Sequence, residues 1–436
     1  MQDATSKVIR AARGISGSLR LPGDKSISHR YAMLGAIAEG ETRLSNFSTG
    51  ADCASTLGCL KTLGVEWLGR DGDVVIQGQG KELRPPDGAL KLDCGNSGST
   101  MRMLSGILAG QKFSCELVGD ESLSRRPMAR IITPLEKMGA KISAEPGGKP
   151  PLHITGATLR GISYDMPVPS AQVKTSLLFA GLYADGATSV TEAIRTRDHG
   201  EIALRAFGAE VAQRVAQKDK TLTIAGGQRL HGIQASIPGD ISSAAFFLCA
   251  AGLFPGSKLV LDSLLMNPTR ARLFDILMQL GIKISVVEME EKHGELAGTI
   301  QAAGGQLKGA TISGADSTAL IDEIPVLAAI APYTTSGIDI RDASELRVKE
   351  SDRIAAVATN LRKMGAEVEE REDGLKIPGG QKLHGSELDS FGDHRIAMAF
   401  AVAALRAEGD TQINNADAAV ISYPAFFETL DRLVER

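Results

Sequence analysis

The chain has 436 residues, of which 43% are apolar and 23% charged, and its formal net charge is −4 at pH 7. This length exceeds what one hydrophobic core usually serves, so we expect two domains of roughly 200 residues each. The slight negative charge argues against a general nucleic-acid surface, which needs a basic excess, so an anionic ligand must meet local cations.

The cysteines and the first residues indicate a reducing compartment. The five cysteines are odd in number, form no CxxC pair and lie mostly among apolar residues, which predicts buried free thiols. The start, MQDATSKVIRAARG, lacks an apolar signal core, and no run reaches the roughly 18 apolar residues of a membrane helix. We therefore expect a cytoplasmic protein with no membrane partner.

A short pattern, L-x-x-[LMF]-G-[VAI]-x-[VIW], recurs along the chain. It is typical of the last turn of an amphipathic helix, a glycine in the left-handed C-terminal cap and the start of a strand. LDRLVER at the C-terminus resembles a sixth copy that stops before its glycine. The five complete copies are 69 to 84 residues apart and have the glycines Gly64, Gly139, Gly208, Gly281 and Gly365.

Between these copies lie six apolar stretches, each after a strand-like run and a polar or glycine-containing turn. Stretches such as FFLCAAGLF and IAMAFAVAAL are hydrophobic nearly all round, which predicts helices buried in a domain centre. The PGD at 22–24 returns at 238–240, half the chain later. We therefore predict an α/β fold of two similar three-repeat domains. Helix N-termini attract anions, so the N-termini of these six helices (their heads) are candidate anion sites.

The first candidate site residues are in LPGDKSISHR, residues 21–30. Asp24 is a plausible N-cap, and Lys25, His29 and Arg30 are three side chains that can be cationic. Ser26 and Arg30 are four apart and share a helical face. A capped helix with solvated charges is the alternative interpretation.

The second and third repeats offer a glycine turn, arginines and another helix start. CGNSGSTMR resembles a phosphate loop but lacks its Lys-Ser/Thr pair, so it is not a P-loop. Gly98 remains a candidate because a ligand can approach closely where there is no side chain. Alternatively the segment is a plain glycine turn. ESLSRRPMAR supplies the candidates Arg125 and Arg126, and the alternative interpretation of this segment is an exposed loop. PSAQVK supplies Ser170 and Gln172, and TRDHGE supplies Arg197. Helix capping explains Ser170 equally well.

The later repeats add two acids and more cations. Asp322 and Glu323 stand at the head of an apolar helix, where a carboxylate is costly unless it is partnered or catalytic. In ELRVKESDR, the spacing places Lys349, Glu350 and Arg353 on one helical arc, and a salt-bridged solvated face is the alternative.

FGDHRIAMAF starts the last buried helix with a histidine and an arginine. These groups all fall near the same position of a repeated unit, which predicts one site. Two phosphorylated acids carry roughly −5 to −6 together, which the cations could match. The seven cations are Lys25, Arg30, Arg126, Arg197, Lys349, Arg353 and Arg395.

Six motifs of the chain are LPGDKSISHR, GNSGSTMR, the SAQ triplet, NPTR at 267–270, ELRVKESDR and GDHRIAMA. Through them the chain resembles the 5-enolpyruvylshikimate-3-phosphate synthase (3-phosphoshikimate 1-carboxyvinyltransferase) family from about residue 14 to 427. SAQ and ELRVKESDR resemble its second sequence class. The resemblance implies two domains, 22–238 and 1–21 plus 239–436. Each has three βαβαββ units around buried parallel helices, an inside-out α/β barrel. It implies an active site in the cleft between them, with hinges near Leu21-Pro22 and Pro238-Gly239.

The resemblance also implies the reaction: the enolpyruvyl group of phosphoenolpyruvate moves to the 5-hydroxyl of shikimate 3-phosphate, and phosphate leaves, through a tetrahedral intermediate. This is a step of the shikimate pathway to chorismate and aromatic amino acids, and a glyphosate target. No metal, cofactor or nucleic acid is implied, and we expect a monomer.

Site residues are carried over from the matching motifs. Asp322 is the implied general base, and Glu350 and Lys25 are the implied proton-transfer groups. The implied shikimate-3-phosphate ligands are Lys25, Ser26, Arg30, Ser170, Ala171, Gln172, Arg197, Asp322 and Lys349. The implied phosphoenolpyruvate ligands are Lys25, Gly98, Arg126, Gln172, Arg353 and Arg395.

Two departures and two rival functions stand beside this resemblance. Ile421 replaces a lysine of the first class, and the arginine loop leaves Arg125 as a rival to Arg126. Gly98 stands where alanine in some members accompanies glyphosate tolerance. UDP-N-acetylglucosamine enolpyruvyl transferase carries a reactive loop cysteine, whereas Cys115 here lies in an apparent strand, FSCELV. A non-catalytic repeat protein that binds phosphorylated metabolites would not explain Asp322 and Glu350.

Overall fold

The computed structural model describes residues 5–70 and 72–436. Residues 1–4, which belong to the expected second domain and to the segment searched for a signal, lie outside the described residues. The chain divides into an N-terminal unit, Pro22–Ile237 with Glu291–Glu295, and a C-terminal unit, Met1–Leu21, Pro238–Glu290 and Leu296–Arg436. In the described ranges no helix has the length and apolar character needed to cross a membrane.

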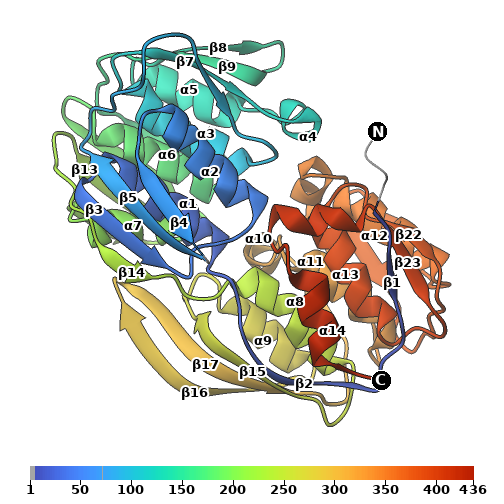
Figure 1. Cartoon of the computed structure of the whole chain (residues 1–436). Coiled ribbons are helices and arrows are strands. Elements are labelled where there is room, and N and C mark those ends of the chain that lie inside the picture. Colours follow the sequence, from blue (N-terminus) through green and yellow to red (C-terminus); the bar gives the residue numbers. More distant parts are fainter. Residues whose placement is uncertain (1–4, 71) are drawn as a thin grey trace. The chain divides into compact units, whose positions relative to one another are not determined.

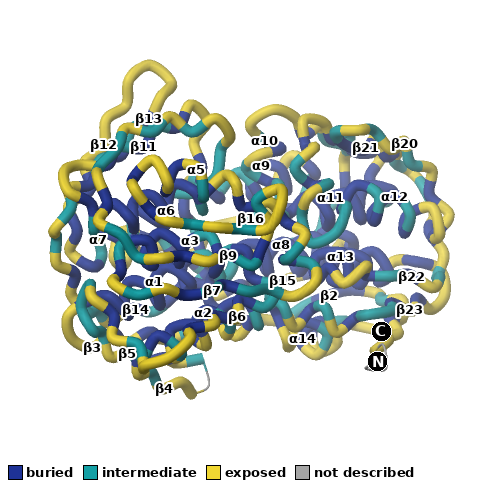
Figure 2. Tube along the Cα trace, turned by 90° about the horizontal axis from the view of Figure 1, so that it is seen from above, coloured by how far each residue is buried: buried dark blue, intermediate teal, exposed yellow. Residues whose placement is uncertain are grey.

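Buried helices form the centre of each unit (Figures 1 and 2). Every residue is buried in three of them, α8 (Ile241–Gly252), α11 (Ile324–Ile330) and α13 (His394–Ala404), and the other three are buried except near their N-termini. Small residues let them pack closely: a Cβ at Gly106 would lie 2.1 Å from the Ser176 carbonyl oxygen. The prediction of buried central helices is confirmed. They are α1 (Lys25–Ile37), α3 (Gly98–Ala109) and α6 (Ala171–Gly181), then α8 (Ile241–Gly252), α11 (Ile324–Ile330) and α13 (His394–Ala404).

Outer helices end at the repeated glycines. The five glycines have φ between 82° and 102°, the left-handed cap that the pattern predicts. The sixth copy ends α14 without a glycine and enters a short strand, β24 (Val434–Glu435). The outer helices are α2 (Ala51–Thr62), α5 (Ala129–Lys137), α7 (His199–Ala206), α9 (Arg272–Gln279), α12 (Arg353–Lys363) and α14 (Phe426–Leu433); shorter ones are α4 (Glu121–Ser124), α10 (Ala315–Ala319), η1 (Ala331–Tyr333), η2 (Ser344–Val348) and η3 (Ala416–Ile421).

The N-terminal unit has three four-stranded sheets with the same pattern: one parallel pair, then two antiparallel pairings. This identity of pattern marks three structural repeats. The sheets are β14 (Gln234–Ser236), β3 (Glu39–Ser45), β5 (Asp73–Gln79), β4 (Trp67–Arg70); β6 (Leu90–Asp93), β7 (Ser114–Val118), β9 (Lys149–Thr155), β8 (Lys141–Glu145); and β10 (Ser163–Asp165), β11 (Ala187–Glu192), β13 (Asp219–Ala225), β12 (Val211–Ala216).

The C-terminal unit also builds each of its three sheets around a parallel pair. The turn of the β16–β17 hairpin is grouped with the N-terminal unit. The sheets are β16 (Lys283–Lys292), β17 (Glu295–Ala303), β15 (Lys258–Leu265), β2 (Gly14–Arg20), β24; β18 (Ala310–Ile312), β19 (Ile338–Ile340), β21 (Gly374–Ile377), β20 (Glu369–Arg371); and β1 (Lys7–Ile9), β23 (Thr411–Asn414), β22 (Glu387–Asp389).

Candidate active site

In the N-terminal unit, the head of α1 presents a lysine beside a carboxylate. Asp24 caps the helix by accepting the Ile27 N–H at 2.9 Å, as predicted. Lys25 Nζ lies 2.7 Å from Asp52 Oδ2, and both side chains are largely buried, 19% and 8% exposed. Asp52, which the sequence analysis did not single out, therefore fixes the ammonium at the start of the helix.

Arg30 is a buried cation with neutral partners. Its Nε and Nη2 donate to Thr175 Oγ1 at 3.2 and 3.0 Å, and Nη1 donates to the Ser26 carbonyl at 2.8 Å. Burial lowers the pKa of Arg30 to about 10; the Asp24 carboxylate opposes this shift and the charge of Arg197 adds to it. Arg30 thus stays charged at neutral pH and makes no ion pair with the described residues, so its charge is available to an anion.

His29 is not the cation that the sequence allowed. Burial lowers its pKa well below 6.5, and the charges of Lys25 and Arg30 lower it further. Its Nδ1 lies 2.7 Å from Thr56 Oγ1 in a buried chain of hydroxyls. The chain continues through Thr100 Oγ1 to Ser97 Oγ, the N-cap of α3. The imidazole is therefore neutral and links α1 to the turn before α3 through α2.

The head of α3 begins at a position with no side chain. A Cβ on Gly98 would lie 2.7 Å from Arg102 Nη1 and 3.5 Å from Arg126 Nη1. Arg126, 7% exposed, donates from Nη2 to Asn96 Oδ1 at 2.9 Å and to Ser122 Oγ at 3.1 Å. Arg125 instead pairs with Glu121 on the surface. Of the two rival arginines, Arg126 is the one buried beside the Gly98 turn.

The head of α6 is joined to α3 by one glutamine. Ser170 caps α6 by accepting the Val173 N–H at 3.3 Å, and Ala171 is its first residue. Gln172 Oε1 accepts from Arg102 Nη1 at 2.9 Å, and its Nε2 donates to Ser99 Oγ at 2.8 Å. Arg102, in the GNSGSTMR motif, was missed as a candidate because its side chain can be placed only once α6 is known.

In the C-terminal unit, Arg353 is the centre of a group of acids. Its Nε lies 2.8 Å from Asp393 Oδ2, and its Nη2 lies 2.6 Å from Glu350 Oε2. Although burial alone would lower it, the carboxylates of Asp393, Glu350 and Asp322 raise the pKa of Arg353 above its ordinary value. Its buried Nη1 has no hydrogen-bond partner and lies 3.5 Å from Asp322 Oδ1. One donor of a fixed guanidinium is thus left for a ligand.

Asp322 lies between two guanidinium groups. Arg395 Nε lies 3.7 Å from Asp322 Oδ1, and its Nη1 donates to the Asp322 carbonyl at 2.8 Å. The neighbouring Glu323 is instead paired with the buried Arg270 of the NPTR motif at 2.8 Å. Burial lowers the pKa of Lys349, which the Asp322 carboxylate opposes. Of the two acids, Asp322 is therefore the one associated with the predicted site cations, and Glu323 pairs with Arg270 instead.

The expected helical arc of Lys349, Glu350 and Arg353 is wrong. Lys349 follows the short helix η2 with extended φ and ψ, and α12 begins only at Arg353. Asp352 interrupts the helix because its carboxylate accepts the Ala355 N–H at 3.0 Å and caps α12. Glu350 reaches Arg353 from the preceding loop.

All five cysteines are free and buried, as predicted. Cys115 lies in β7, and burial raises its pKa to about 12. A thiol of this kind is a poor nucleophile. Cys115 therefore does not supply the reactive cysteine of the rival sugar-nucleotide reaction.

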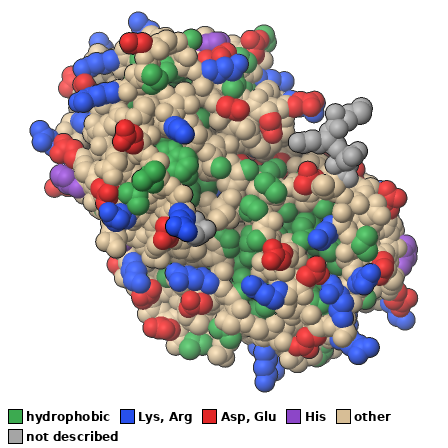
Figure 3. Space-filling model, in the orientation of Figure 1, with side chains coloured by type: hydrophobic (Ala, Val, Ile, Leu, Met, Phe, Trp, Pro, Cys, Tyr) green, Lys and Arg blue, Asp and Glu red, His purple; other side chains and the backbone are tan. Residues whose placement is uncertain are grey.

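The charged residues of the candidate site form local clusters and not one charged surface. Acidic and basic side chains are interspersed on the surface seen in Figure 3. Within the described ranges, no group of three or more His, Cys, Asp or Glu residues could hold a metal ion.

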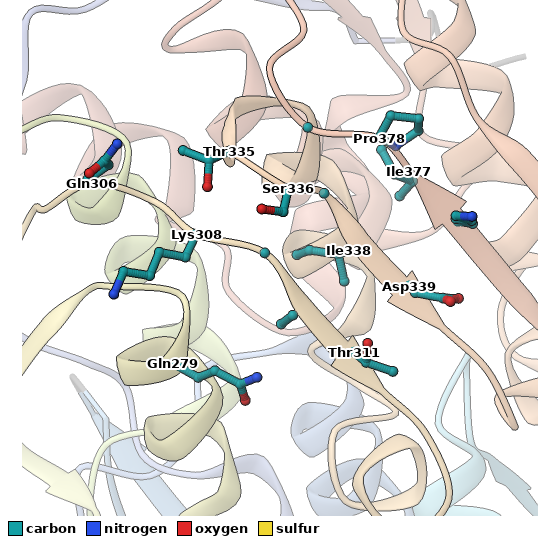
Figure 4. Close-up of a pocket in the computed structure, with 15 residues that line it drawn as sticks. Gln279, Gln306, Lys308, Thr311, Thr335, Ser336, Ile338, Asp339, Ile377 and Pro378 are labelled. Atoms are coloured by element: carbon teal, nitrogen blue, oxygen red, sulfur yellow. The ribbon is translucent and has the colours of Figure 1, made fainter.

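A cavity of about 770 Å³ in the C-terminal unit is separate from these residues (Figure 4). Its lining includes Gln306, Lys308 and Thr335, and it includes none of the predicted site residues. Asp339, which also lines it, is already paired with Arg341 and Arg371 at 2.6 and 2.8 Å. We therefore do not place the active site there.

Comparisons with known proteins cover nearly the whole chain. A family model described as EPSP synthase (3-phosphoshikimate 1-carboxyvinyltransferase) matches residues 9–430. The chain is 59% identical to the 3-phosphoshikimate 1-carboxyvinyltransferase of Koribacter versatilis, over 98% of this chain and 99% of that protein. It is 56% identical to the enzyme of the same name from Solibacter usitatus, over 98% and 100%. A solved EPSP synthase from Acinetobacter baumannii matches with a TM-score of 0.87 and 41% identity, over 99% and 98%.

Proposed function

This chain belongs to the EPSP synthase family, and on that premise we propose that it transfers the enolpyruvyl group of phosphoenolpyruvate to the 5-hydroxyl of shikimate 3-phosphate, with release of phosphate. It is a transferase of the shikimate pathway, which leads to chorismate and the aromatic amino acids, and a member of the family that glyphosate targets. Its fold is the α/β fold of enolpyruvyl transferases, as predicted. The match over residues 9–430 is the observation that carries the assignment.

For shikimate 3-phosphate, we propose that cations without ion-pair partners meet the phosphate. Arg30 is buried with neutral hydrogen-bond partners, and Lys349 makes no hydrogen bond or ion pair with any described residue. Charge-assisted bonds from such groups are among the stronger ones in proteins. The proposed ligands are Lys25, Ser26, Arg30, Ser170, Ala171, Gln172, Arg197, Asp322 and Lys349.

For phosphoenolpyruvate, the support is the Nη1 donor of Arg353 and the two arginine side chains beside Gly98. The donor is buried without a hydrogen bond, which is costly unless a ligand accepts from it. At Gly98, the missing side chain leaves room for two guanidinium groups at the N-terminus of α3, because a Cβ there would lie 2.7 Å from Arg102 Nη1 and 3.5 Å from Arg126 Nη1. The proposed ligands are Lys25, Gly98, Arg126, Gln172, Arg353 and Arg395.

The proposed chemistry is addition followed by elimination. Asp322 takes the proton of the 5-hydroxyl as that oxygen bonds to C2 of phosphoenolpyruvate, while Glu350 or Lys25 protonates the methylene carbon. The resulting tetrahedral intermediate then loses a proton from the new methyl group and expels phosphate, which restores the double bond. The guanidinium groups 3.5 and 3.7 Å from Asp322 already offset its charge and would stabilise charge that develops nearby.

We propose that the clusters of both units act on one pair of substrates, in an active site formed by two three-repeat domains. The chain passes between the units near Leu21-Pro22 and Pro238-Gly239, and we propose these segments as hinges. Closure that excludes water would strengthen every charge-assisted contact and is part of the proposed mechanism. We also propose that the protein is a cytoplasmic monomer, which cell fractionation and light scattering would test.

Release of inorganic phosphate tests the function. Purified protein with phosphoenolpyruvate and shikimate 3-phosphate should release phosphate in equimolar amounts with the enolpyruvyl product. The controls omit one substrate or supply UDP-N-acetylglucosamine as the acceptor. Release only with the UDP-sugar would select the rival transferase, and tight binding without release in any mixture would select a binding protein.

A further inference from the structure

Four buried charges connect the elements around Arg197, and the proposed mechanism uses none of them. Lys174 Nζ, in α6, lies 3.1 Å from both Glu192 Oε1 and Glu201 Oε1. Lys220 Nζ, in β13, lies 2.9 Å from the same Glu201 oxygen. The four side chains are 0% to 9% exposed. Two cations balance two anions, but apolar residues of similar volume would often stabilise such a core equally well. Stability alone therefore gives little reason for this network.

The same network fixes the segment before Arg197. Glu192 is the last residue of β11, and its second oxygen, Oε2, accepts both the N–H and the hydroxyl of Thr196, at 3.1 and 2.7 Å. The intervening residues, 193–195, are exposed, whereas Thr196 is buried. One carboxylate thus binds Lys174 with one oxygen and closes the loop with the other.

The segment after Arg197 is fixed as well. His199 starts α7, and its Nδ1 lies 2.6 Å from Glu295 Oε1, with both side chains buried. Arg197 therefore lies between two anchored residues, Thr196 and His199. Its backbone is held on both sides within two residues.

Lys174 also connects this loop to α6, whose N-terminal end carries Ser170 and Gln172. The next residue, Thr175, accepts two hydrogen bonds from Arg30. A Cβ at Gly200 would lie 2.5 Å from Thr175 Oγ1, so the head of α7 packs directly against α6. One buried network thus joins the elements that carry Arg30, Gln172 and Arg197.

We propose that Lys174, Glu192 and Thr196 are positioning residues that hold Arg197 ready for the phosphate of the acceptor. This inference rests on the proposed function. If the loop already has its binding conformation, less conformational entropy of the long Arg197 side chain is lost on binding. Loss of the clamp should therefore weaken shikimate 3-phosphate binding and leave phosphoenolpyruvate binding unchanged, because Arg197 is not among the proposed ligands of the latter.

Thr196→Val tests this with little change of volume, since it removes only the hydroxyl bond to Glu192. We expect the KM and the calorimetric Kd for shikimate 3-phosphate to rise roughly 3- to 10-fold, the factor for immobilising one long side chain. The KM for phosphoenolpyruvate and the kcat at saturation should stay within about 2-fold. Thr196→Ser, which restores the hydroxyl, should recover the affinity.

Thr188→Val is the matched control, because Thr188 is buried in β11, the strand that ends at Glu192, and its hydroxyl has no hydrogen-bond partner. It should bind shikimate 3-phosphate like the wild type. If Thr196→Val also does so, or only lowers the melting temperature, the residue is merely structural and the inference is overturned. Equal rises in both KM values would overturn it too. A wild-type protein that fails to use shikimate 3-phosphate would refute the proposed function itself, before any variant is compared.

Discussion

The buried pair of Arg353 and Asp393 makes a quantitative prediction about stability. Asp393 is fully buried and accepts from Arg353 Nε at 2.8 Å and from Ser351 Oγ at 3.0 Å. It also caps α13 by accepting the Arg395 N–H at 2.9 Å. In Asp393→Asn, the amide oxygen can still cap the helix, but the charge opposite a buried guanidinium is lost. The substitution therefore separates ion pairing from capping.

Breaking a buried ion pair costs about 3 to 5 kcal/mol, and we expect about 3 kcal/mol because Glu350 and Asp322 still face Arg353. For a unit of about 200 residues this lowers the melting temperature by roughly 6 to 12 °C. Differential scanning calorimetry and urea unfolding at pH 7 measure both quantities. The KM for phosphoenolpyruvate should rise in the same variant because Arg353 loses the group that orients it.

Asp352→Asn is the control for this experiment. Asp352 caps α12, and its partner Arg347 lies 2.7 Å away in a pair whose side chains are 27% and 39% exposed. An exposed pair contributes about 0 to 1 kcal/mol, so this variant should unfold close to the wild type. If Asp393→Asn loses no more stability than Asp352→Asn, Asp393 does not compensate Arg353 and the reasoning is refuted.

Three further predictions concern catalysis, access and pH. Asp322→Ala should lower kcat about 10²- to 10⁴-fold while the protein stays folded; retained phosphate release would exclude it as general base. Gly98→Ala should raise the phosphoenolpyruvate KM and the inhibitory glyphosate concentration, since its Cβ would lie 2.7 Å from Arg102; unchanged inhibition curves would contradict this. His29 has a lowered pKa in the folded protein, so below about pH 6.5 only the unfolded state gains the proton. The free energy of unfolding should therefore fall by about 1.4 kcal/mol for each unit by which the pH is lowered, relative to His29→Gln. Urea unfolding measures this, and parallel pH profiles of the two proteins would disprove it.

Local signals predicted much of the fold. The repeated glycines predicted left-handed caps, which follow from the steric cost of a Cβ at positive φ, and all five have that conformation. The all-apolar stretches predicted six buried helices. Asp24 was correctly predicted as an N-cap, and the alternative interpretation of Ser170 as a cap is also confirmed, because a cap bonds to residues three positions along the same chain.

Spacing alone failed where a cap or burial changed the local structure. The i, i+3 and i+4 pattern placed Lys349 and Glu350 in a helix, but Asp352 caps α12 and leaves both in the loop before it. His29 was counted among possible cations, but burial beside Lys25 and Arg30 keeps it neutral. Neither effect has a signature in residue spacing.

The sequence by itself determined the repeats, the central helices and the residue types at their heads, because helix periodicity, capping and glycine conformation depend on near neighbours along the chain. Only the tertiary structure decided which partner each charge takes: Asp52 for Lys25, Asp393 for Arg353, and Arg270 rather than a substrate for Glu323. These partners come from segments 27 to 53 residues away. Electrostatic energy depends on distance and burial in space, which no local pattern specifies.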